Sequence, residues 1–342
     1  MRNENNILRE AVRLISESHS IAILSHFNPD PDAYGSSCGL AHIVRSIMPI
    51  CDVRVFNEDA DTAQERLAFL SGAEDVSASP GDFQPALIIT CDSGELNRVG
   101  DELEQWVLLN KEVPLINIDH HESNNNFGTI NVVQTGASST SELVVDLFRV
   151  WNDTRDARIE MPNEAAECLL AGILGDTGAF RYRSTTADTL EKSADLIRAG
   201  ARLDYLTNHL FGSVPISTMK MNGIGLQKMR TLCGGRIAGV AITDEDYATV
   251  GGGPKDAEEL AELFRDIDGV EVSYSLRWVD GKWKASLRTA RADVDLAAVA
   301  TSFGGGGHRA AAAFRASGEL SDILTRLECA LEKALLEVKE PC

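Results

Sequence analysis

Short apolar runs alternate with helical patterns over roughly the first 200 residues, and this alternation constrains the fold more than any other feature of the chain. The runs are almost continuously hydrophobic, as expected for strands that are covered on both faces. The stretches between them, such as 35–48 and 138–150, have the pattern of helices. Alternation of this kind predicts an α/β fold with a parallel sheet. The predicted strands are residues 21–26, 52–56, 86–92, 114–121 and 129–133.

The C-terminal third of the chain has a different pattern, which is typical of a smaller α+β domain. Residues 236–242 are predicted as a strand, and 270–290 as a hairpin with Asp280-Gly281 at its turn. A final amphipathic helix is predicted over about 319–338. The less patterned segment before this region is interpreted as a connection. We therefore expect a larger domain at 1–210, a linker at 211–235 and a smaller domain at 236–342.

The composition limits the partners that the chain can have. It holds 52 acidic and 32 basic residues, for a net charge of −20. A protein that follows long nucleic acids needs a basic stripe, and the sequence has none. Any phosphate substrate should therefore be small and held by locally placed cations. The acidity is equally compatible with a role in solubility alone.

Targeting and disulfide signals are absent from the sequence. No apolar run approaches the ~18–20 residues of a membrane span. The N-terminal segment has the pattern of an amphipathic helix and lacks the apolar core of a signal peptide, so we expect a cytoplasmic protein without membrane contact. The seven cysteines are scattered without CxxC spacing, which indicates neither a disulfide framework nor a zinc finger.

Acidic and histidine residues cluster where the predicted strands end. Ligands bind in the crevice outside the carboxyl ends of parallel strands, so side chains from several strand ends would converge there. Each residue alone is compatible with ordinary turn chemistry, but the same coincidence at three strand ends favours a site. The candidates are His26, Asp30 and Asp32 after the first run, Asp92 after the third, Asp119, His120 and His121 after the fourth, and Asp176 at a predicted helix end.

The residue types at these strand ends predict the kind of ion. Imidazoles and carboxylates without thiolates favour a borderline-hard divalent cation over structural zinc. The candidates outnumber the ligands of one tetrahedral centre, which suggests two ions roughly 3.5–4 Å apart, as in phosphoester hydrolysis. Mn²⁺ fits the mixed ligand set best, and Mg²⁺ is an acceptable substitute.

A second constellation lies near the C-terminus, in the glycine-rich stretch at 302–314. The backbone N–H groups of Gly305, Gly306 and Gly307 can approach an anion closely, and His308 follows them. The alanine run after the histidine is predicted as a helix whose N-terminus adds positive potential. A flexible glycine hinge is the alternative interpretation.

The predicted hairpin holds another candidate for anion binding. Ser286 and Arg288 share one face of its second strand, and Arg291 is near in sequence. Solvated surface arginines are an equally good interpretation of this spacing.

Five ordered motifs give the chain a family resemblance. They are "HFNPDPDAYGS" at 26–36, "CD" at 91–92, "DHH" at 119–121, "GILGDTGAF" at 172–180 and "GGGGHRAAAAF" at 304–314. Over nearly its whole length the chain resembles the DHH phosphoesterases, and its length and motif order are most similar to the nanoRNase/pAp phosphatase branch. The resemblance implies a metal-dependent hydrolase that acts on short single-stranded oligonucleotides, on 3′-phosphoadenosine 5′-phosphate (pAp), or on both.

The resemblance also implies two metal ions that share a carboxylate, with Asp92 as the expected bridge. One ion would be held by His26, Asp30, Asp92 and Asp176, and the other by Asp32, Asp92, His120 and Asp176. An activated water would then attack the phosphoryl group in line.

Catalytic and substrate-binding roles follow from the same resemblance. His121 would face the substrate phosphate or the leaving oxygen, and Asp119 would orient its neighbours. Arg288 and His308, with Ser286 and the glycines at 305–307, would hold the other phosphate or the 3′ end of the substrate.

Two departures from the family pattern concern the substrate more than the metals. Ala313 stands where a glycine is expected, and Ser184 stands where an Asn is expected. Alternative activities are a cyclic-dinucleotide or pApA phosphodiesterase, a single-strand exonuclease and a pyrophosphatase. From another class, a nucleotide-binding sensor on the same fold is the alternative, although every ligand position is filled. The size and the resemblance are compatible with a homodimer.

Overall fold

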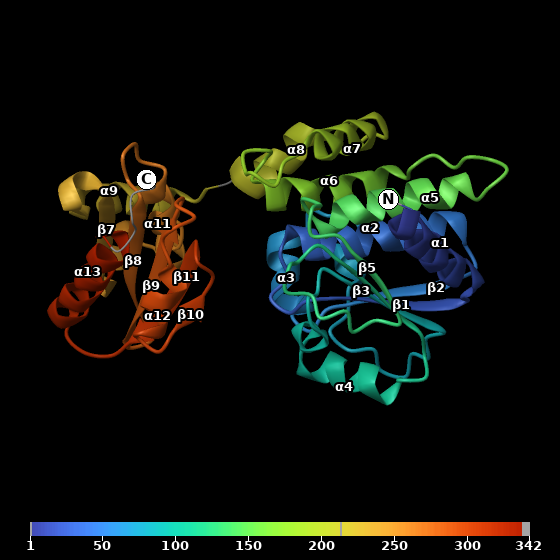
Figure 1. The fold of residues 1–342 in the computed structure, drawn as a ribbon, viewed down its shortest axis with the longest axis horizontal. Helices are drawn as coiled ribbons and strands as arrows, with labels where there is room; N and C mark the ends of the chain where they lie inside the picture. The colour runs from blue at the N-terminus through green and yellow to red at the C-terminus, as the bar shows by residue number, and fades with distance from the viewer. Residues whose placement is uncertain (1, 213, 337–342) are drawn as a thin grey trace. The chain divides into compact units, whose positions relative to one another are not determined.

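The computed structural model describes residues 2–212 and 214–336, which separate at residues 213/214 into two compact units. Each unit is built on a sheet of its own (Figure 1). None of the helices in these described ranges combines the length and the apolar character that a membrane crossing requires.

The first unit contains a five-stranded parallel sheet in the order β2-β1-β3-β4-β5. The prediction of a parallel α/β sheet is therefore confirmed. Residues 120–121, which the sequence analysis included in the fourth strand, lie just beyond it. The strands are β1 Ser20–Ser25, β2 Asp52–Phe56, β3 Leu87–Cys91, β4 Leu115–Asp119 and β5 Ile130–Val133.

Helices cover both faces of this sheet, as Figure 1 shows. On one face α1, α2, α5 and α6 pack into a large apolar core, and on the other Leu103 and Val107 of α4 contact a smaller one. The α-helices of the unit are α1 Arg2–Glu17, α2 Pro31–Ile47, α3 Ala60–Leu67, α4 Asp101–Leu109, α5 Thr140–Asp153, α6 Asn163–Thr177, α7 Ala187–Arg198 and α8 Leu203–Thr207. Coverage of both faces explains why the three inner strands, β1, β3 and β4, are buried along their whole length.

Glycines allow α2 and α6 to approach each other closely. A Cβ on Gly35 would meet the backbone nitrogen of Gly172 at 2.9 Å, and one on Gly172 would meet Oδ1 of Asp32 at 2.6 Å. Side chains at these positions would separate the helices. The close approach brings the start of α2 and the end of α6 to the same edge of the sheet.

The second unit contains a six-stranded mixed sheet in the order β10-β11-β9-β8-β7-β6, in which only β7 and β8 are parallel neighbours. Its strands are β6 Arg230–Leu232, β7 Ile237–Ile242, β8 Val272–Val279, β9 Lys282–Thr289, β10 Gly306–Gly307 and β11 Ala311–Ala316. Its α-helices are α9 Ile216–Lys228, α10 Asp244–Val250, α11 Leu260–Arg265, α12 Leu296–Thr301 and α13 Leu320–Leu336.

The predicted hairpin is β8–β9, with Asp280 and Gly281 as its two turn residues. Both have positive φ, 50° and 74°, as a type I′ turn requires.

The segment 211–235, which we expected to be a connection, is largely structured. It contains α9, whose Met221 is fully buried in a core of the second unit, and β6, which pairs with β7. The helical pattern is weak because Gly223 and Gly225 lower the intrinsic helix propensity, and packing compensates for it.

The alanine run after His308 is a strand, and the prediction of a helix there is wrong. β11 pairs with β9 on one side and with the two residues of β10 on the other. Ala312 and Phe314 point into the core at alternate positions, so burial follows the period of a strand. Pairing in the sheet overrides the helical preference of alanine.

Candidate metal centre

The loop between β1 and α2 brings the first histidine and two carboxylates together. Asp30 is the N-cap of α2, and its Oδ1 accepts hydrogen bonds from the backbone N–H groups of Asp32 (2.9 Å) and Ala33 (3.0 Å). Its Oδ2 lies 3.8 Å from Nε2 of His26. Nδ1 of His26 lies 2.8 Å from the carbonyl oxygen of Phe27, so Nε2 faces the carboxylates. The cap therefore leaves one oxygen of Asp30 available for a cation.

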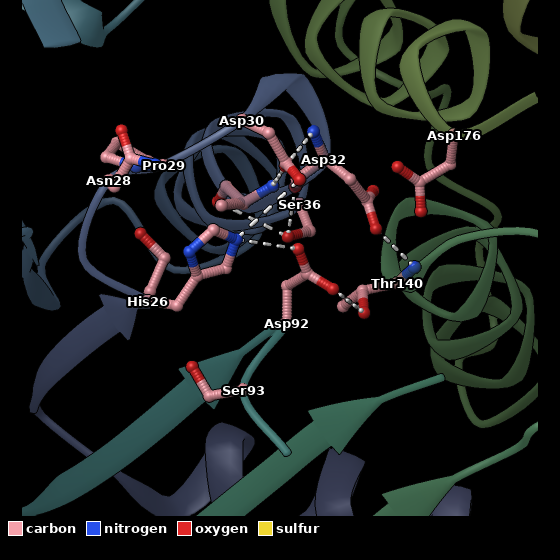
Figure 2. A network of polar contacts seen from close by, with 12 residues as sticks. His26, Asn28, Pro29, Asp30, Asp32, Ser36, Asp92, Ser93, Thr140 and Asp176 are labelled. Carbon is pink, nitrogen blue, oxygen red and sulfur yellow. Dashed lines mark hydrogen bonds and ion pairs between the residues drawn. The ribbon is translucent and has the colours of Figure 1, made fainter. Parts of the chain in front are cut away.

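Asp92 lies at the centre of the site, directly after β3 (Figure 2). Its Oδ2 lies 3.4 Å from Nε2 of His26, and its Oδ1 lies 3.5 Å from Nε2 of His120. Oγ1 of Thr140 donates a hydrogen bond of 3.1 Å to Oδ1. Asp92 has a left-handed backbone (φ 59°), a strained conformation that clusters at functional sites.

Asp32 points into the first turn of α5, as Figure 2 also shows. Its Oδ2 accepts a hydrogen bond from the N–H of Thr140 (2.6 Å), and its Oδ1 accepts one from the N–H of Ser141 (2.9 Å). The side chain is fully buried. Burial, and then the charge of Asp92, raise the pKa of Asp32, whereas the two amide donors favour its anion.

The residues after β4 contribute the adjacent histidines. Nε2 of His120 lies 3.2 Å from Oδ2 of Asp176, at the end of α6. Nδ1 of His121 lies 2.7 Å from Oδ1 of Asp119, and the His121 side chain is 47% exposed. Asp119 thus fixes the ring of His121 and leaves Nε2 on the accessible side.

The protonation of the cluster reflects its crowded charges. Although burial opposes it, hydrogen bonds to Asp30 and Asp92 raise the pKa of His26 to about 10. Against the same opposing effect of burial, Asp176 and Asp92 raise the pKa of His120 to about 12. Burial alone would raise the pKa of Asp92, but the hydrogen bonds from His120 and His26 lower it well below its usual range. In the metal-free state, protonated imidazoles therefore offset part of the negative charge of the carboxylates.

The donor atoms fit a divalent metal. Each of three groups of residues offers ligand atoms that all lie within 4.8 Å of one another. Ligands at about 2.1 Å from one ion lie roughly 3 Å apart, close to the 3.2–3.8 Å separations between imidazole nitrogens and carboxylate oxygens here. Asp92 and His120 each belong to two of the groups. The groups are His26, Asp30 and Asp92; Asp32, His120 and Asp176; and Asp92, His120 and His121.

Comparisons with known proteins decide the family. Residues 20–173 match the DHH family, N-terminal domain, and residues 245–338 match the DHHA1 domain. The bifunctional oligoribonuclease and PAP phosphatase NrnA of Thermus thermophilus is 31% identical over 97% of this chain and 94% of its own length. The chain belongs to the DHH family. It is therefore a DHH phosphoesterase, a hydrolase that acts on phosphoester bonds.

Two further proteins are similar to the chain over most of its length. The NrnA protein of Bacillus subtilis is 29% identical over 87% of this chain and 90% of its own length. The crystal structure of an exopolyphosphatase-related protein from Bacteroides fragilis has a TM-score of 0.84, 26% identity and 97% coverage of both chains. The similarity to both proteins extends over both units.

The second unit of this DHH phosphoesterase holds the other predicted residues. Ser286 is buried on β9, and Nε of Arg288 lies 2.8 Å from Oε1 of Glu262, so the guanidinium already has a carboxylate partner. His308 is exposed at the turn between β10 and β11, where its N–H donates to the carbonyl oxygen of Ala311 (2.8 Å). Gly306 and Gly307 form β10, and Gly305 precedes it.

The sequence analysis missed the residues that support the ligands. Nδ2 of Asn124 lies 2.6 Å from Oδ2 of Asp119 and 2.8 Å from Oδ1 of Asn117, which is itself buried. Thr140 contacts both carboxylates, through its backbone N–H to Asp32 and through its hydroxyl to Asp92. A polar Asn117 in the middle of an apolar strand was the one available signal.

Proposed function

We propose that this DHH phosphoesterase hydrolyses short single-stranded oligonucleotides, pAp, or both, with two Mn²⁺ ions that Mg²⁺ can replace. The observation that carries the proposal is the central position of Asp92, whose two carboxylate oxygens face His26 on one side and His120 on the other. A carboxylate between two ligand groups is the arrangement that a pair of ions requires. The names of the relatives with similar length support the choice of substrates.

The proposed ligand sets extend two of the groups of donor atoms described above by one shared carboxylate each. One set comprises His26, Asp30, Asp92 and Asp176, and the other comprises Asp32, Asp92, His120 and Asp176. When bound, the ions would lower the pKa of a water molecule and stabilise charge on the phosphoryl oxygens.

His121 is the proposed proton donor or phosphate contact. The hydrogen bond to Asp119 raises the pKa of His121, so the ring is cationic over a wider pH range than a free histidine. Nδ1 is occupied by that bond, and the side chain is half-exposed, so that Nε2 is free to contact a substrate oxygen. A cationic N–H at this position would stabilise charge that develops on the leaving oxygen.

The second unit is proposed to bind the part of the substrate remote from the reacting phosphate, through Ser286, Arg288, His308 and the glycines at 305–307. The guanidinium of Arg288 already forms an ion pair with Glu262. A phosphate would therefore compete with that carboxylate for the guanidinium. Arginine suits this role because its planar fork pairs with phosphate oxygens.

A substrate panel tests the proposal. The purified protein is incubated with pAp, dinucleotides, longer oligonucleotides, pApA, a cyclic dinucleotide and pyrophosphate, with Mn²⁺ or with excess chelator. We expect metal-dependent hydrolysis of pAp and of oligomers of a few nucleotides, with rates that fall as the oligomer lengthens. Exclusive cleavage of pyrophosphate or of the cyclic dinucleotide would contradict the proposed substrates, and turnover in chelator would contradict the metal requirement.

A further inference from the structure

A buried ion cluster joins helices α5 and α7 next to the metal centre. The side chains of Lys192 on α7 and Glu142 on α5 are almost fully buried. Nζ of Lys192 lies 3.1 Å from Oε1 of Glu142 and 2.6 Å from one oxygen each of Asp146 and Asp188. Buried ion pairs contribute little net stability relative to apolar packing, whereas breaking one leaves an uncompensated charge. Loss of Lys192 would therefore leave buried carboxylates without a partner between α5 and α7.

The second oxygen of Glu142 holds the chain where it enters α5. Oε2 accepts hydrogen bonds from the N–H of Ser138 (3.0 Å) and from its hydroxyl (2.6 Å). It also accepts one from the hydroxyl of Thr189 (3.0 Å), which is fully buried on α7. Glu142 thus connects the residue before the helix with the neighbouring helix.

The first turn of α5 carries the donors that hold two proposed metal ligands. Ser139 is its N-cap, and the N–H groups of Thr140 and Ser141 donate to the two oxygens of Asp32. The hydroxyl of Thr140 donates to Asp92. These N–H groups have no partner within the helix, so Asp32 satisfies them. A shift of this turn would rotate both carboxylates.

We propose that Lys192 and Glu142 are positioning residues of the metal centre. Their buried ion pair fixes the first turn of α5, and that turn fixes the carboxylates of Asp32 and Asp92. Neither residue belongs to the proposed ligand sets. The inference rests on the metal centre of the proposed function. Its test distinguishes failure of the positioning role from failure of the proposed function.

The principal variant is Lys192→Met, which keeps an unbranched side chain and removes the charge. We expect Mn²⁺ affinity, measured by calorimetry well below the unfolding temperature, to fall by roughly 10–100-fold, as for other residues that orient metal ligands. In the metal-free protein the amides of Thr140 and Ser141 should exchange hydrogen faster, a readout that does not depend on activity.

Arg149→Met is the matched control. Arg149 also connects α5 with α7, through a 2.8 Å ion pair with Asp195 on the exposed surface and away from the first turn. It lies 3.6 Å from Asp146 at the edge of the cluster. Exposed pairs of this kind contribute little. We expect wild-type Mn²⁺ affinity and wild-type exchange at Thr140 and Ser141.

Thr189→Val keeps the test valid if Lys192→Met fails to fold. It removes one neutral donor to Glu142 and also the acceptor for the N–H of Thr186, the N-cap of α7. We expect a loss of Mn²⁺ affinity of roughly two- to tenfold. Wild-type affinity and exchange in the folded variants would overturn the positioning role while leaving the proposed function intact. Failure of the wild-type protein to bind Mn²⁺ would instead overturn the proposed function.

Discussion

Asp92 combines three properties that bear on its proposed role. It is buried, its backbone is left-handed, and its two oxygens face different histidines. A left-handed backbone is tolerated by Asp and Asn, so the amide is the least disruptive replacement.

Asp92→Asn is the first prediction. The amide keeps the shape but loses the negative charge that both candidate ions would share, so we expect metal-dependent hydrolysis to fall by more than about 100-fold. Circular dichroism should show an unchanged fold. Wild-type turnover in a folded Asp92→Asn protein would refute the assignment of this residue.

Asp119→Asn is the second prediction and concerns the orientation of His121. Loss of the carboxylate removes the main cause of the raised pKa of the imidazole. We expect kcat to fall about 10–100-fold. The alkaline limb of the pH–rate profile, which reflects loss of the proton from His121, should move to lower pH. An unchanged profile would show that the His121–Asp119 pair has no part in the proton transfer.

The third prediction follows from the raised pKa values of His26 and His120. With values of about 10 and 12, both imidazoles are protonated at neutral pH in the metal-free protein, and a cation must displace those protons. Mn²⁺ affinity should therefore rise with pH from 6 to 8, with release of roughly one to two protons per chain. Calorimetry in two buffers of different ionisation enthalpy measures the release. Affinity independent of pH would contradict the account.

At the scale of elements, the site depends on the close packing of α2, α5 and α6. Gly172 of α6 faces Asp32 of α2 and Ser141 of α5 without space for a methyl group. The three helices therefore meet where α2 and α6 present carboxylates and the first turn of α5 presents hydrogen-bond donors.

Gly172→Ala is the fourth prediction. The added methyl group should push these helices apart, destabilise the first unit by about 1–3 kcal/mol and weaken Mn²⁺ binding. The control is Gly223→Ala in α9, where the surroundings are open and we expect stabilisation by about 0.5–1 kcal/mol. Denaturant unfolding, followed separately for the two units, measures both changes. Equal stability of the Gly172→Ala protein would contradict the packing argument.

Elements of strong periodicity could be predicted from the sequence, and elements set by tertiary contacts could not. The apolar runs identified the strands, and their polar ends identified His26, Asp92 and the DHH triplet as neighbours. The contacts of Thr140 with Asp32 and Asp92 depend on the packing of α5 against α2, which no local pattern encodes. The alanines of β11 were misjudged for the same reason, because a partner strand decides their conformation.

At the scale of the whole molecule, the two units divide the candidate residues between them. The proposed metal ligands lie in the unit with the parallel sheet, and the glycine-rich turn with His308 lies in the unit with the mixed sheet. We expect the net charge of −20 to oppose the binding of long polyanions, so that locally placed cations attract the substrate. This balance favours short substrates over long ones.

Anomalous diffraction from crystals grown with Mn²⁺ tests the central claim most directly. The account predicts two peaks per chain, roughly 3.5–4 Å apart, with Asp92 in contact with both. His26 and Asp30 should contact one ion, and Asp32 and His120 the other. A single peak, or peaks that Asp92 does not touch, would contradict the account.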